Sequence, residues 1–81
     1  MKKNAIIEFL GWCGVIAIVT AYFLNSFDVL SASSSTYQWL NLAGAAAIGI
    51  DAIKDKNYQP AVLNSIWAII AVIALIKILH A

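Results

Sequence analysis

Three apolar stretches, separated by two short polar ones, make up this chain. The most apolar covers residues 60–79, whose only markedly polar side chains are Asn64, Ser65 and Lys77. A helix of that length is about 30 Å long, which matches the hydrocarbon core of a bilayer. A water-soluble helix keeps a polar face, and this stretch has none. The pattern predicts a membrane-spanning helix with Pro60 in its first turn, where the missing N–H is not needed.

The other two apolar stretches predict two further helices. Residues 5–24 form a run of similar length, and residues 37–53 form a shorter run that is rich in Ala and Gly. In the shorter run Asn41, Ala45 and Gly49 follow each other at four-residue spacing, so they share one helix face. Small side chains on one face let helix backbones approach closely in a membrane. We therefore expect the second helix at the centre of the bundle.

The polar stretches predict the connections between these helices. Residues 25–36 are rich in Ser, Asn and Asp, as loops are, and Ser33–Thr36 has hydroxyl groups that can cap the next helix. Residues 54–59 form a turn so short that the helices it joins are antiparallel neighbours. We expect a single domain over residues 1–81 that folds as an all-α, transmembrane three-helix bundle.

Composition agrees with a membrane protein and argues against several other classes. Hydrophobic residues make up 63% of the chain and charged residues 11%, against about 25% charged in a typical globular protein. A formal charge of +1 is too small for electrostatic binding of nucleic acid. No catalytic Ser-His-Asp or Cys-His set, metal-ligand cluster or glycine-rich phosphate loop is recognisable, so we expect no enzymatic activity, metal or cofactor.

Lysines predict how the chain is oriented in the membrane. The N-terminal segment and the second connection are basic, whereas the first connection has no lysine and the C-terminal end has one, and these basic residues are Lys2, Lys3, Lys54, Lys56 and Lys77. The positive-inside rule then places the N-terminus and the second connection in the cytoplasm, and the C-terminus on the opposite side. We expect a multi-pass protein of the inner (cytoplasmic) membrane, since the first apolar run is too long for a signal peptide.

Asn64 is the polar side chain that we expect to be functional. It lies about one turn inside the third helix, with Trp67 three residues further on the same face. An amide in hydrocarbon needs hydrogen-bond partners. One interpretation is a structural bond to another helix, for example to Asn41. The other is a ligand for a neutral solute, in which the amide binds hydroxyl groups and the indole rings of Trp67 and Trp12 cover the apolar face of the solute.

Two carboxyl groups also lie within predicted helices. Glu8, about one turn into the first helix, is either an interfacial carboxylate paired with a lysine or a group that couples transport to protons or cations. Its place near the basic end, away from the middle of the bilayer, favours the first interpretation. Asp51 lies three residues before Lys54, so a local ion pair accounts for it.

Several motifs resemble known families. Leu-Gly-Trp-Cys-Gly and Ala-Tyr-Phe-Leu in the first helix, Tyr-Gln-Trp-Leu-Asn-Leu-Ala-Gly in the second and Leu-Asn-Ser-Ile-Trp-Ala-Ile-Ile in the third resemble a family of small, uncharacterised bacterial membrane proteins with three helices. Gly44, the short charged turn, Pro60 and Asn64 are more distantly similar to the SemiSWEET sugar transporters of the PQ-loop fold, which dimerise around a solute path. That resemblance implies that Asn64 contacts the solute. Ile48 stands where those transporters have a tryptophan, and their proline in the first helix is missing.

The functional expectation combines these observations. Three helices hardly enclose a solute path, so transport requires at least a dimer. We expect a homodimeric half-transporter for a small neutral solute, and its expected solute-binding residues are Asn64, Trp67, Asn41 and Trp12, with Glu8 and Asp51 as coupling or ion-pair residues. The alternative is a non-transporting accessory subunit of the membrane whose polar residues hold helices together. A holin-like pore former fits less well, because such proteins end in a longer charged tail.

Overall fold

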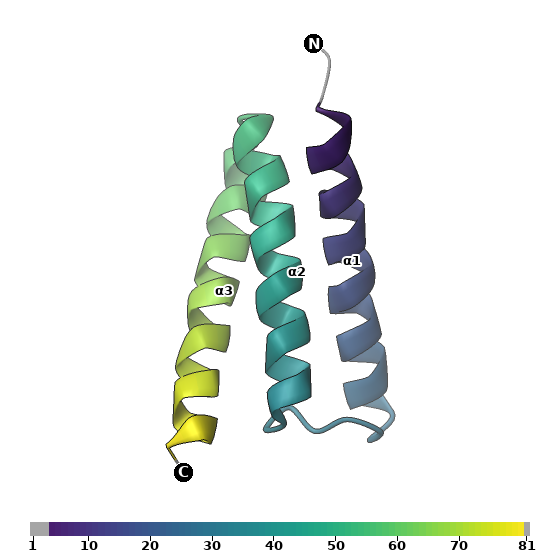
Figure 1. Cartoon of the computed structure of the whole chain (residues 1–81), viewed down its shortest axis with the longest axis vertical. Helices are drawn as coiled ribbons and strands as arrows, with labels where there is room; N and C mark the ends of the chain where they lie inside the picture. Colours follow the sequence, from purple (N-terminus) through teal and green to yellow (C-terminus); the bar gives the residue numbers. More distant parts are fainter. Residues whose placement is uncertain (1–3, 81) are drawn as a thin grey trace.

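Three α-helices joined by two short connections form the structure, a computed structural model that describes residues 4–80. The helices are α1 (Ala5–Ser26), α2 (Ser35–Lys54) and α3 (Tyr58–Leu79). α2 lies between the other two and runs antiparallel to both (Figure 1). The predicted all-α, three-helix fold with the second helix at its centre is confirmed. α2 and α3 each begin two residues before the predicted start.

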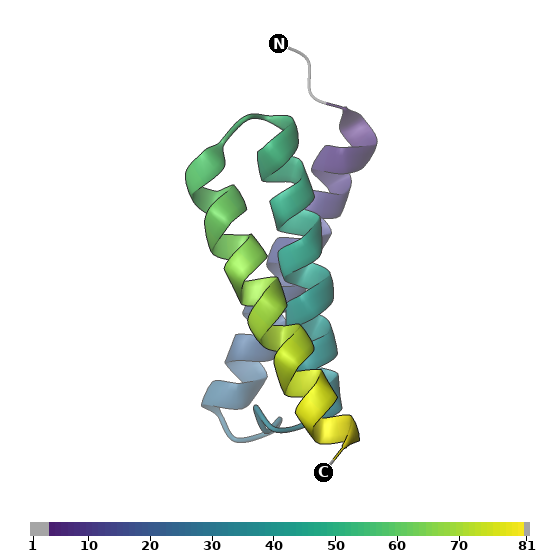
Figure 2. The ribbon, with the colours of Figure 1, turned by 90° about the vertical axis from the view of Figure 1, so that its left-hand side faces the viewer.

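The two outer helices pack against α2 and not against each other. Within residues 4–80, no Cα atom of α1 lies within 8 Å of a Cα atom of α3, whereas both helices approach α2 closely. Viewed from the side of α3, this helix crosses in front of α2, and α1 lies behind (Figure 2). α2 therefore forms the bottom of the space between α1 and α3. No other helix of residues 4–80 covers this space.

Two of the three helices are long and apolar enough to cross a membrane. These are α1 and α3, and most of their large apolar side chains are exposed. α2 does not meet the same criterion, because Gln38, Asn41 and Asp51 lower its hydropathy. The core residues that α2 presents to its neighbours are small, and the buried ones are Asn41, Gly44, Ala45, Gly49 and Ala52. Of the three membrane spans predicted from the sequence, α1 and α3 therefore meet this criterion and α2 does not.

Local hydrogen bonds define the helix ends. The Ser34 hydroxyl oxygen accepts a bond from the backbone N–H of Tyr37 at 3.2 Å, which confirms the capping hydroxyl predicted before α2 and explains its earlier start. Two residues after the end of α2, Lys56 lies in the left-handed region at φ 56°, and the backbone N–H of Asn57 donates to the carbonyl oxygen of Ala52 at 2.8 Å. This is the Schellman arrangement, in which glycine is the usual left-handed residue.

α1 and α2 approach each other closely at two glycines. A Cβ atom built on Gly14 would lie 2.6 Å from the carbonyl oxygen of Gly44, and one built on Gly44 would lie 2.6 Å from a side-chain carbon of Ile18. Neither helix therefore tolerates a larger side chain there without moving apart. The contact between α2 and α3 is looser, because a Cβ on Gly49 would meet Asn64 Cβ at an ordinary 3.7 Å.

A first prediction concerns the α1–α2 contact. Gly14→Ala should destabilise the folded protein by about 1–3 kcal/mol, because its methyl group meets backbone atoms that cannot turn away. Gly49→Ala is the matched control: it adds the same methyl group without a clash and removes a helix-disfavouring glycine, so stability should stay equal or rise by up to about 1 kcal/mol. Unfolding in mixed detergent micelles, followed by circular dichroism, measures both. Equal effects of the two substitutions would contradict the contact.

A second prediction concerns the turn between α2 and α3. Lys56→Gly should stabilise the protein by about 1 kcal/mol, because a left-handed conformation is unfavourable for a residue with a Cβ atom and free of that cost for glycine. The exposed Ala43, which lies in the interior of α2, is the control, since Ala43→Gly should destabilise by about 1 kcal/mol. The same unfolding assay should therefore give opposite signs for these two substitutions.

Candidate functional site

Two asparagine side chains are the buried polar groups of the bundle, at 5% exposure each among the described residues. Asn41 Nδ2 donates to the carbonyl oxygen of Tyr37 at 3.1 Å, and Asn64 Nδ2 donates to that of Pro60 at 2.8 Å. Each amide thus bonds to its own helix, four residues back. The hydrogen bond between Asn41 and Asn64 that we considered from the sequence is not formed, because Asn64 faces Gly49, which lies about two helical turns along α2 from Asn41.

Each amide keeps its second N–H and its oxygen atom for further hydrogen bonds. The bond to the preceding turn uses one N–H of a group that can donate two hydrogen bonds and accept two. Within residues 4–80, no donor is bonded to the Oδ1 atom of Asn41 or Asn64, and no fully buried side-chain polar atom lacks a partner. These oxygen atoms are therefore partly accessible from the surface, where each asparagine lines a groove.

The first groove, which we call the aromatic groove, lies between α1 and α3 over α2. It has a volume of about 300 Å³ and is lined from all three helices by Ile18, Val19, Tyr22, Tyr37, Asn41 and Trp67. Two phenol rings and an indole ring thus surround one buried amide. Asn41 and Trp67, two of the four predicted solute-binding residues, come together here.

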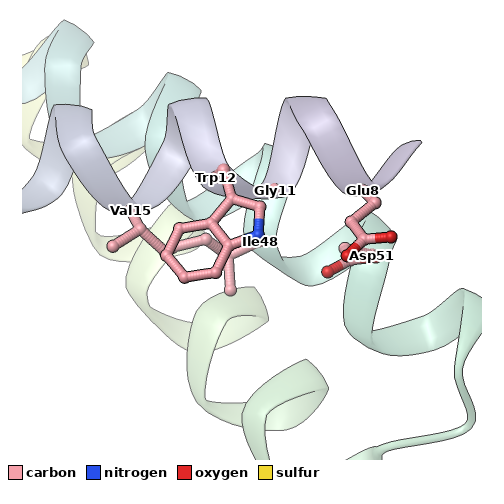
Figure 3. A pocket seen from close by; sticks show the side chains of 6 residues that line it. All are labelled: Glu8, Gly11, Trp12, Val15, Ile48 and Asp51. Atoms are coloured by element: carbon pink, nitrogen blue, oxygen red, sulfur yellow. The ribbon is translucent and has the colours of Figure 1, made fainter. Parts of the chain in front are cut away.

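The second groove, the acidic groove, lies between α1 and α2 near the turn that leads to α3. Its volume is about 240 Å³, and it is lined by Glu8, Gly11, Trp12, Val15, Ile48 and Asp51. Figure 3 shows Glu8 and Asp51 reaching the same end of this groove from the two facing helices, with the Trp12 ring further along it. A Cβ atom on Gly11 would lie 2.8 Å from Asp51 Oδ2, so a larger residue there would make this carboxylate shift from its place against α1.

The acidic and aromatic grooves follow one another along the same face of α1. The residues of α1 that line the two grooves follow one another at alternating steps of four and three positions, so they lie on one face of the helix. These residues are Glu8, Trp12, Val15, Val19 and Tyr22. We call the two grooves together the trough. Five of the six predicted site residues line the trough, and these are Asn41, Trp67, Trp12, Glu8 and Asp51.

Asn64 lies outside the trough. It lines a smaller groove of about 180 Å³ on the other side of the α2–α3 contact, with small neighbours that include Gly49, Ser65 and Ala68. Three residues turn a helix by about 300°, so Asn64 and Trp67 are adjacent on α3 but lie on opposite sides of the line where α2 packs. Asn64 and Trp67 therefore do not line the same groove.

Some predicted roles of the carboxylates stay predictions. Lys2 and Lys3, considered as partners of Glu8, lie outside the described residues. The structure also does not test whether Asp51 pairs with Lys54. The sequence analysis did not place Tyr22 or Tyr37 in a site, although both line the trough. The stripe through Trp12 and Tyr22 was a signal that could have found the first of them.

Comparison with known proteins places the chain in one group. A family of uncharacterised proteins matches residues 7–81, which is nearly the whole chain. No curated protein and no solved structure matches it. The resemblance to SemiSWEET and PQ-loop transporters receives no support from these comparisons.

A third prediction tests the two amides. Because Asn41 and Asn64 each bond to their own helix, Asn41→Ala and Asn64→Ala should change the free energy of unfolding additively, within about 0.5 kcal/mol. A double-mutant cycle in detergent measures this coupling. A coupling energy above about 1 kcal/mol would instead indicate a direct bond between the two helices.

Proposed function

Because this chain belongs to the family of uncharacterised proteins matched over residues 7–81, which brings no activity with it, we propose a function from its own residues. The protein is an integral membrane protein with three embedded helices that acts as a homodimeric half-transporter for a small neutral solute. The observation that supports this proposal most is the trough, where a buried amide, aromatic rings and two carboxyl groups share one face of an otherwise apolar bundle.

The aromatic groove has the chemistry for a neutral solute. Asn41 offers a free N–H and an oxygen, Tyr22 and Tyr37 have hydroxyl groups, and Trp67 presents a flat apolar surface. A volume of about 300 Å³ is at the lower end of small-molecule sites. None of these groups is charged, so the groove suits a polyhydroxylated or amide-containing molecule better than an ion.

The outer surface supports a place within the membrane. Large apolar side chains such as Ile16, Phe23, Ile69 and Ile73 are more than half exposed, which a protein in water avoids on this scale. Three polar residues of α2, namely Tyr37, Asn41 and Asp51, line the trough, so they lie on the side of α2 between α1 and α3. Lys54 and Lys56 lie at the end of the bundle where α1 begins, and this end faces the cytoplasm in our proposal.

An accessory subunit is the second candidate, supported by the groove at Asn64. Small side chains with one amide are the usual features of helix–helix contacts in membranes. In this alternative the protein binds a helix of another membrane protein through that groove and transports nothing. The two candidates therefore differ in which asparagine is essential.

The fourth prediction separates these candidates. Purified protein in sealed liposomes should increase the rate at which the vesicles reswell in glycerol, xylose or glucose, measured by light scattering after an osmotic shock. Asn41→Leu and Trp67→Ala should each lower the rate for the transported solute at least tenfold, because they remove the amide and the stacking surface. Asn64→Leu is the control and should leave the rate within about twofold of the unaltered protein, since it lies in another groove.

The outcome that contradicts transport is equally defined. If none of these solutes or a wider panel of neutral solutes passes faster than through protein-free vesicles, the half-transporter proposal is wrong. If Asn64→Leu alone removes the activity while Asn41→Leu keeps it, the solute site is at Asn64 instead. Circular dichroism of each variant confirms that it retains its helices.

A further inference from the structure

The open side of the trough differs from the rest of the lipid-facing surface. It presents the free amide atoms of Asn41 and the carboxyl group of Glu8. Acyl chains have no hydrogen-bond donors, so polar groups at membrane depth face protein or water. The opposite face of α2 presents Trp39 and Ile50, which lipid can cover. The trough therefore needs a cover other than lipid.

We infer that the cover is a second copy of this chain, which packs trough to trough about a two-fold axis parallel to the helices. This inference rests on the proposed function, since the second copy closes the solute path that one protomer leaves open. In this arrangement the edge of α1 in each copy lies against the edge of α3 in the other. Both copies line the enclosed space, so the site is incomplete in a single protomer.

The two edges match in their hydrogen-bonding groups and in their apolar residues. The edge of α1 has a carboxyl group at Glu8, followed by apolar residues from Trp12 to Tyr22. The edge of α3 has an exposed amide at Gln59, followed at helical spacing by Leu63, Trp67 and Ile70. An amide N–H is a donor for a carboxylate oxygen, which accepts only. Acceptor thus faces donor, and apolar surface faces apolar surface.

The direction of the helices allows this match. α2 is antiparallel to both neighbours, so α1 and α3 run in the same direction (Figure 1). A two-fold axis along the bundle keeps that direction in the second copy. Glu8 of one copy and Gln59 of the other, each near the start of its helix, then lie at the same end of the dimer. Both copies therefore have the same orientation across the membrane.

A disulfide tests this pairing directly. In a Cys13→Ala background, the double variant Val19→Cys and Ile70→Cys places one thiol on each edge, at exposed positions. A disulfide needs Cα atoms within about 7 Å. No Cα atoms of α1 and α3 come within 8 Å of each other in the described chain, so any disulfide between these two positions joins two copies. Oxidation in native membranes should convert most of the protein to a dimer on a non-reducing gel.

Two controls make the result specific. Ile50→Cys places a single thiol on the opposite face of α2 and should give at least fivefold less dimer. Gln59→Lys, which strengthens the attraction to Glu8, should maintain or increase the dimer yield of the double variant, whereas Gln59→Glu should lower it severalfold by repulsion. Dimer from Ile50→Cys with none from the double variant would overturn the inference, as would equal yields from the lysine and glutamate variants.

The disulfide and the flux assay can fail separately. A trough-to-trough disulfide in a protein that passes no solute supports this pairing and contradicts only the half-transporter proposal. Flux that depends on Asn41, together with absence of the disulfide, supports transport and overturns the pairing.

Discussion

The contact between Gly14 and Gly44 determines the architecture on which the other features depend. Because neither residue has a side chain, the backbones of α1 and α2 meet directly, and a methyl group on either one would overlap its neighbour. α1 is held against one flank of α2, while Ala45 and Gly49 receive α3 on another. The angle between these two flanks leaves α1 and α3 apart, and the trough is the space that results.

The fold could be predicted from the sequence because its signals are local. The apolar lengths of residues 5–24 and 60–79, the hydroxyl groups before α2 and the short charged turn each define one element without reference to the rest. Three of the six helix ends differ from the prediction by two residues and one by a single residue; at the start of α2, capping by Ser34 extends the helix beyond its apolar run. The side chains at these ends are polar, and hydropathy alone places the boundary too far inside.

The candidate site was less predictable because it depends on how the helices pack. Asn64 and Trp67 are three residues apart, and only the position of α2 shows that they line different grooves. An amide in hydrocarbon indicated a need for a partner, yet each asparagine meets part of that need within its own helix. Gly11 and Gly14 received no role from the sequence, because a close approach involves the surface of another helix.

If the three helices are embedded as we propose, the absence of contact between α1 and α3 also affects how the protein enters the membrane. α2 alone is too polar to enter the bilayer readily, whereas α3 is strongly apolar and joined to it by three residues, Asp55 to Asn57. The pair can therefore insert as a helical hairpin whose second arm brings in the first. α1 needs nothing from α3 and can be in place before the hairpin is synthesised, so the order of the helices along the chain is also a workable order of assembly.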